Sequence, residues 1–127
     1  MGKLKIHKCQ LYPVSMIYCR KSQADLLKKI AHIDKEHTRT IENVGEGSYA
    51  TTFKTYFLKN SMSVICVVFE DEKFPISKMA HEAIHVADFV FSVVGGRESV
   101  DPTTANEPYA YLVDWIVRCM CESLGIE

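Results

Sequence analysis

The sequence predicts an α+β domain with helices packed on a small, mainly antiparallel three-stranded sheet. Two segments, residues 50–58 and 63–69, flank a turn around Lys59 and Asn60, which is the pattern of a β-hairpin. Residues 12–20 are rich in β-branched and aromatic side chains and predict a third strand. Segments with helical spacing lie before and after the hairpin. The predicted order is strand, helix, strand, strand, helix, helix, in one domain that covers residues 1–127.

The first helix is predicted over residues 21–36. Ser22 can cap its start, and four apolar residues recur on one side at helical spacing: Leu26, Leu27, Ile30 and Ile33. A loop is expected over residues 37–50, where Asn43, Gly45 and Gly47 interrupt the pattern. The strand at 63–69 is apolar on both faces, so we expect it to be covered on both sides.

Two further helices are predicted after the hairpin. One begins near residues 75–77 and stops at Gly95 and Gly96, since glycine favours helix ends. The other begins close to Thr104, which has capping-box spacing to Glu107, and continues to Gly125. A polar loop joins the two helices.

Composition excludes several classes of protein. The net charge of −1 gives no reason to expect a nucleic-acid partner. No apolar stretch is long enough to cross a membrane, and the first residues lack the apolar core of a signal peptide. The chain has five cysteines, an odd number that does not suit a disulfide framework, so we expect a cytoplasmic protein. Cys66 is expected in the core, whereas Cys119 and Cys121 should face different sides of their helix.

The segment "HEAIH", residues 81–85, carries the predicted chemistry. Four residues bring an α-helix round about one turn with a rise of roughly 6 Å, so His81 and His85 can converge on one ion. Zinc favours imidazole nitrogen, and a catalytic zinc site keeps one position open for water. Glu82 lies about 100° round the helix from His81, beside the ion, where its carboxylate can take a proton from that water.

A third zinc ligand must come from elsewhere, and Glu107 is the preferred candidate. It lies in the first turn of the last helix, 22 positions after His85, and antiparallel packing of the two helices could return it to the histidines. Asp88 is the other candidate for the third ligand. It lies three positions after His85 on the same helix, where its carboxylate reaches the ion only with difficulty, so it is preferred as a residue that supports the site or lies on the polar face. Asp114 could accept the spare ring hydrogen of a ligand histidine.

These residues resemble a known group of enzymes. "HEAIH" with a downstream "NEPYAY" resembles a minimal gluzincin, a zinc metallopeptidase whose third ligand is a glutamate. "HEAIHVADFV…NEPYAYLVDWIV" is similar to small metallopeptidases encoded by bacteriophages, over about residues 77–117. The resemblance implies a zincin-like fold that binds Zn²⁺ through His81, His85 and Glu107. It implies that Glu82 is the general base and later the proton donor, and that the hairpin edge could hold an extended peptide in the host cytoplasm.

The chain departs from larger gluzincins in the groups that stabilise the oxyanion. Those enzymes carry a second domain or extra histidines and tyrosines, whereas the nearest candidates here are Tyr109 and Tyr111. The leading hypothesis is therefore a zinc-dependent peptide hydrolase that acts on a peptide or protein substrate. The alternatives are a non-catalytic, zinc-stabilised protein-binding module of phage origin, or a helix whose two histidines bind no metal.

Overall fold

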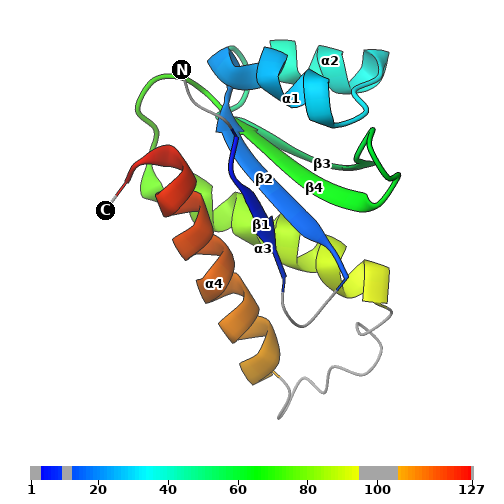
Figure 1. Ribbon diagram of the computed structural model, residues 1–127. Coiled ribbons are helices and arrows are strands. Elements are labelled where there is room, and N and C mark those ends of the chain that lie inside the picture. The colour runs from blue at the N-terminus through cyan, green and yellow to red at the C-terminus, as the bar shows by residue number, and fades with distance from the viewer. Residues whose placement is uncertain (1–3, 10–12, 95–105, 127) are drawn as a thin grey trace.

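A computed structural model describes residues 4–9, 13–94 and 106–126 of the chain (Figure 1). At residues 93, 94 and 106–108 it describes the backbone only. The elements in chain order are β1 (Ile6–Lys8), β2 (Ser15–Arg20), a 3₁₀ turn η1 (Lys21–Gln23), α1 (Ala24–Ile30), α2 (Lys35–Glu42), β3 (Ala50–Tyr56), β4 (Ser63–Phe69), α3 (Ile76–Val94) and α4 (Asn106–Leu124).

The sheet has four strands in the order β1-β2-β4-β3 and is mixed. The α+β class and the hairpin of β3 and β4 are confirmed, but the prediction of three mainly antiparallel strands was wrong. β2 runs parallel to β4, because α1 and α2 lead the chain away and back to the end of the sheet where β2 finishes. β3 then runs opposite to β2, and the hairpin turns β4 back into the direction of β2. β1 pairs with β2 over only three residues, too few for a recognisable alternating pattern.

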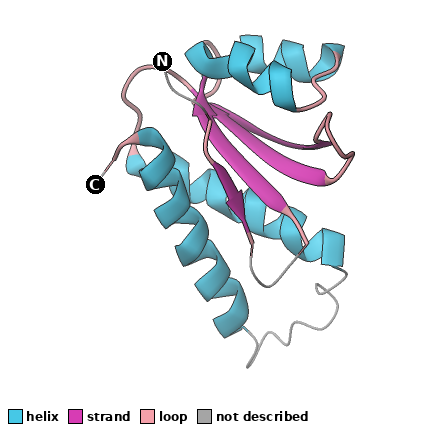
Figure 2. Cartoon of the chain, viewed as in Figure 1, coloured by secondary structure: helices cyan, strands magenta, loops and turns pink. Residues whose placement is uncertain are grey.

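Helices cover both faces of this sheet (Figures 1 and 2). α1 and α2 lie on one face, and α3 and α4 lie on the other. The side chains of β4 alternate between the two cores: Val64, Cys66 and Val68 face α1, while Ile65, Val67 and Phe69 face α3 and α4. All six are fully buried. The expected covering of this strand on both sides and the burial of Cys66 are therefore confirmed.

The predicted first helix is two helices. α1 ends at Ile30, because Ala31 leaves the helix and forms a β-bridge with Phe57. Asp34 then starts α2 by accepting a hydrogen bond from the backbone N–H of His37 at 2.7 Å. The prediction of one helix over 21–36 and a loop from 37 was wrong, because it overlooked Asp34 as a helix cap.

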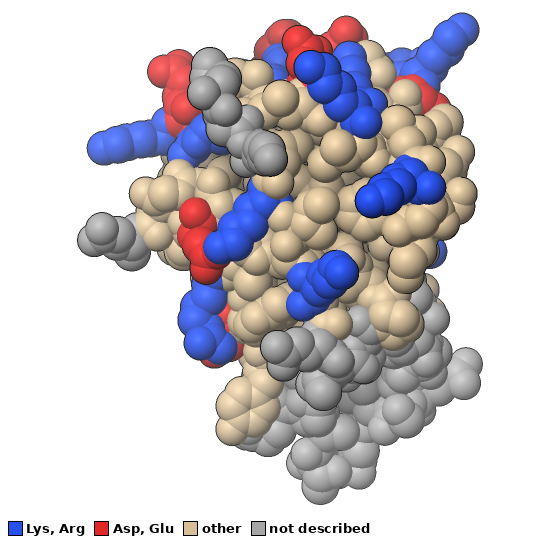
Figure 3. Space-filling model, in the orientation of Figure 1, with Lys and Arg blue, Asp and Glu red and all other residues tan. Residues whose placement is uncertain are grey.

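The two long helices are where the sequence predicted them, and α4 packs against α3 and β2. Gly125 follows α4 with φ +72, the left-handed conformation that glycine adopts after a helix. The residues predicted to form the connecting loop, Gly95, Gly96 and Thr104 among them, lie outside the described part of the chain. Among the described residues, no helix is long and apolar enough to cross a membrane. In Figure 3 the visible surface is largely uncharged, with basic side chains standing apart from one another.

Candidate metal centre

The two histidines of α3 lie on its solvent side, and the opposite side of the helix packs against the sheet. Ala83, Val86 and Val90 have no exposed surface and anchor one side of the helix in the core. His81 and His85 lie on the opposite side and are exposed. The burial pattern thus follows the helical period, and it leaves both imidazoles accessible to a ligand.

The two imidazoles converge. Nε2 of His81 and Nε2 of His85 lie 3.2 Å apart, with the ring planes at 80° to each other. Two nitrogens held about 2.05 Å from one tetrahedral zinc ion would lie roughly 3.3–3.4 Å apart. The observed separation is within about 0.2 Å of that value, so the pair fits two positions of a zinc site. The same distance also suits a hydrogen bond in which one neutral ring donates to the other.

Glu82 is held differently from the histidines. Its side chain is only 8% exposed, and its Oε1 accepts a hydrogen bond from Oγ1 of Thr52 at 2.5 Å. The contact joins α3 to β3, two elements 30 residues apart in the sequence. Because a carboxylate has two oxygens, Glu82 can accept from Thr52 with one and take a proton with the other.

Thr52 lies on a sheet edge. Residues 49 and 57, directly before and after β3, direct their backbone groups toward the β4 arm of the hairpin: Tyr49 O accepts from Glu70 N–H, and Phe57 N–H donates to Met62 O. Alternate residues of a strand point their backbone groups to opposite sides. The backbone N–H and C=O groups of the even-numbered residues of β3 are therefore directed away from β4. His32 N–H donates to Tyr56 O at 3.0 Å from that outer side, as this alternation requires. The Thr52 backbone is therefore directed at the open edge, while its side chain holds Glu82.

The residues expected to support the site are engaged elsewhere on α3 and α4. Tyr109 donates its hydroxyl hydrogen to Oδ1 of Asp88 at 3.0 Å, and its ring stacks on Phe91. Asp114 pairs with Arg118 at 3.3 Å on the exposed side of α4. Tyr111 is 68% exposed. Asp88 and Tyr109 thus connect the two helices one turn beyond His85, whereas the recorded interaction of Asp114 is with Arg118 rather than with a ligand histidine.

The third ligand, Glu107, lies in the first turn of α4, but its side chain is outside the described part of the structure. Among the residues whose side chains are described, no group of three histidine, cysteine or acidic side chains could hold a metal ion. The structure therefore brings together two of the three predicted ligands and leaves the third as a prediction.

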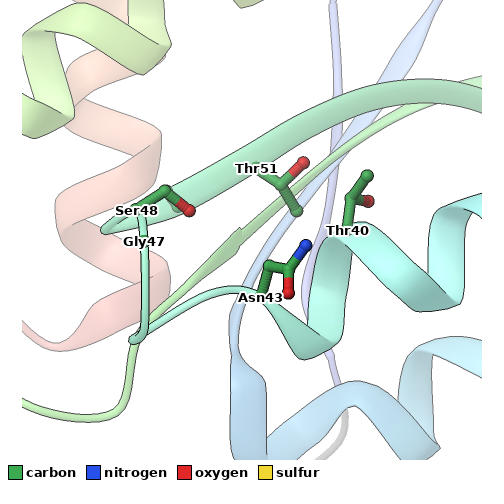
Figure 4. A pocket seen from close by; sticks show the side chains of 6 residues that line it. Thr40, Asn43, Gly47, Ser48 and Thr51 are labelled. Atoms are coloured by element: carbon green, nitrogen blue, oxygen red, sulfur yellow. The ribbon is translucent and has the colours of Figure 1, made fainter.

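A separate pocket lies on the other side of β3. In Figure 4, side chains from the end of α2 and the start of β3 surround an open hollow, lined by Thr40, Asn43, Gly47, Ser48, Ala50 and Thr51. No ionisable side chain lines it. It therefore offers hydroxyl and amide groups for binding but no group for proton transfer, and it does not include the histidine pair.

The sequence did not single out Thr52. Its pattern gave a strand over residues 50–58, and the alternation along that strand puts Ala50, Thr52 and Lys54 on one face. Which helix that face would meet depends on the placement of α3, so the contact with Glu82 could not be read from the pattern.

Comparisons with known proteins add no relative. No family model matches the chain, and no curated protein or solved structure matches it either.

Proposed function

We propose that the chain is a zinc-dependent metallopeptidase of the minimal gluzincin type, with a zincin-like fold. The observation that carries the proposal is the convergence of two imidazole nitrogens to 3.2 Å next to a buried carboxylate on the same helix. Glu107 is proposed as the third ligand. The Tyr109–Asp88 hydrogen bond supports this, because it holds the beginning of α4 against α3 one turn past His85.

Each residue has a defined part in peptide hydrolysis. Bound zinc would supply Lewis acidity toward the peptide carbonyl and make water a nucleophile near neutral pH. His81 and His85 would hold the ion, and their exposure leaves room for substrate. Glu82 accepts the proton of the attacking water and then delivers it to the leaving amine. Thr52 keeps the carboxylate in one orientation while it does so.

The open edge of β3 supports a peptide as the substrate. An extended peptide can add to an exposed strand through main-chain hydrogen bonds. The outward backbone groups of Thr52 would bind such a peptide next to the residue that holds Glu82. The same edge therefore accounts for substrate binding and for the position of the general base.

The first test measures metal content after purification without chelators. We expect one zinc per chain, loss of zinc in His81→Ala and His85→Ala, and retention in His37→Gln. His37 is the matched control because it stacks on Phe53, which belongs to the core of α1 and α2 on the opposite face of the sheet. Absence of zinc from the wild-type chain, or equal zinc in all four proteins, would overturn the proposal.

The second test separates catalysis from metal binding. Glu82→Gln keeps the size of the side chain and an oxygen that can accept from Thr52, but it cannot take the proton. We expect it to retain zinc and to lose cleavage of a fluorogenic peptide pool by at least a factor of about 100. The control is Glu46→Gln, at an exposed loop residue, which should cleave at the wild-type rate. Zinc binding without any cleavage by the wild-type chain would instead favour the non-catalytic binding module.

A further inference from the structure

Three side chains of β3 form a row that faces α3. Ala50 pairs with Phe69, Thr52 with Val67 and Lys54 with Ile65 in the antiparallel register. Paired residues have their side chains on the same face, and these three partners belong to the core that contains α3. Lys54 therefore lies on the face of the sheet that α3 covers, two residues beyond Thr52.

β3 and α3 run in the same direction. Near their beginnings, Nζ of Lys78 lies 5.4 Å from the ring centre of Tyr49, and further along Thr52 bonds Glu82. Two residues of a strand advance about 6.6 Å, which corresponds to roughly four residues of a helix. Lys54 is consequently level with about residue 86 of α3, next to His85.

The charge of Lys54 is available to a ligand. Its side chain is exposed, and the ion pairs in the described part of the chain join Lys5 to Glu122, His37 to Asp34 and Arg118 to Asp114. Of the acidic groups on the neighbouring stretch of α3, Glu82 is bound to Thr52 and Asp88 to Tyr109.

The outer edge of β3 is open at Lys54 but is covered at Tyr56, the next residue whose backbone groups point outward. Residues 30–32 cover the far end, where Ile30 O accepts from Leu58 N–H and His32 N–H donates to Tyr56 O. Thr52 and Lys54 are therefore the outward-facing residues that can pair with an added strand. In that strand, the residue opposite Lys54 has its side chain on the α3 face.

From this geometry we propose that Lys54 determines substrate specificity. It selects extended peptides that carry an aspartate or glutamate opposite Lys54, two residues away from the peptide residue opposite Thr52. The inference rests on the proposed peptidase function and names its substrate class. The ammonium group attracts the carboxylate of the peptide, and the preference weakens with salt because both groups are near solvent.

The experiment uses the zinc-loaded full chain and fluorogenic peptide pools in which one position at a time is fixed as Asp, Ala or Lys. The wild-type chain is expected to cleave the Asp pool roughly three- to tenfold faster than the Lys pool at one position only. Lys54→Gln should remove that preference and Lys54→Glu should reverse it. Lys59→Glu, an equal charge reversal in the exposed hairpin turn, should leave it unchanged.

The outcomes distinguish the two proposals. If zinc is bound and peptides are cleaved, but Lys54→Glu keeps the wild-type preference or Lys59→Glu alters it equally, the specificity inference is wrong and the peptidase proposal stands. If the chain binds no zinc and cleaves no pool, the peptidase proposal fails and the specificity inference fails with it.

Discussion

The hydrogen bond from Thr52 to Glu82 is expected to stabilise the fold as well as the site. Thr52→Val keeps the shape of the side chain but removes the hydroxyl, which leaves a carboxylate that is only 8% exposed without this donor. Leaving a buried polar group unsatisfied costs about 1–3 kcal/mol. Total stability of a domain is about 5–15 kcal/mol, so the loss is a measurable fraction of the whole.

Urea unfolding at pH 7 measures this effect. With a slope near 1.5 kcal/mol per molar urea, the midpoint of Thr52→Val should fall by about 0.7–2 M. Thr52→Ser, which keeps the hydroxyl, should stay within about 0.5 M of the wild type. Glu82→Leu replaces the carboxylate by an apolar side chain, so Thr52→Val should cost less in that background than in the wild type.

Two results would refute the reasoning. One is a urea midpoint for Thr52→Val that equals the midpoint for Thr52→Ser. The first variant lacks the hydroxyl and the second keeps it, so only the first should lose stability by a large amount. The other is an equal loss on Thr52→Val in the Glu82→Leu background, because the energy would then come from packing of Thr52 and not from its bond to Glu82.

Three further predictions concern stability measured by thermal or urea unfolding. Burial, followed by the charge of Lys5, lowers the pKa of His7 below 6.5, so the unfolded chain binds the proton more readily than the folded chain. Stability should therefore fall as the pH drops below about 6.5, and His7→Gln should reduce this dependence on pH between pH 7 and 5. Ile116→Ala, at a fully buried residue, should cost about 2–5 kcal/mol, whereas Ile84→Ala, at a residue 42% exposed, should cost less than half as much. Asp34→Ala should cost about 0.5–2 kcal/mol by removing the cap of α2, and Asp34→Asn should restore most of it.

The fold was predictable where local patterns are strong. The core strand at 63–69 is an almost continuous apolar run, and the two long helices carry apolar residues at helical spacing over 19 residues each. The other arm of the hairpin is marked by its β-branched and aromatic residues. The prediction failed where structure depends on distant partners or on one residue. β1 exists because its three residues pair with β2 and because His7 bonds Oγ of Ser123 at 2.7 Å. The break between α1 and α2 depends on Asp34.

The parallel pairing of β2 with β4 was beyond the sequence pattern for the same reason. Both strands were predicted, but their neighbours in the sheet depend on the packing of α1 and α2 between β2 and β3, and not on the residues of the strands alone. That choice leaves β3 at one edge of the sheet.

The sequence by itself determined the spacing of His81 and His85, because four residues make about one helical turn whatever surrounds the helix. The tertiary structure decided which side of that helix is buried, and so which groups remain exposed. It also brought Thr52 to Glu82 and put Lys54 on the face of the sheet that α3 covers. The hydrogen bond from Thr52 to Glu82 joins residues 30 positions apart, and only the packing of α3 across the sheet can place such residues together.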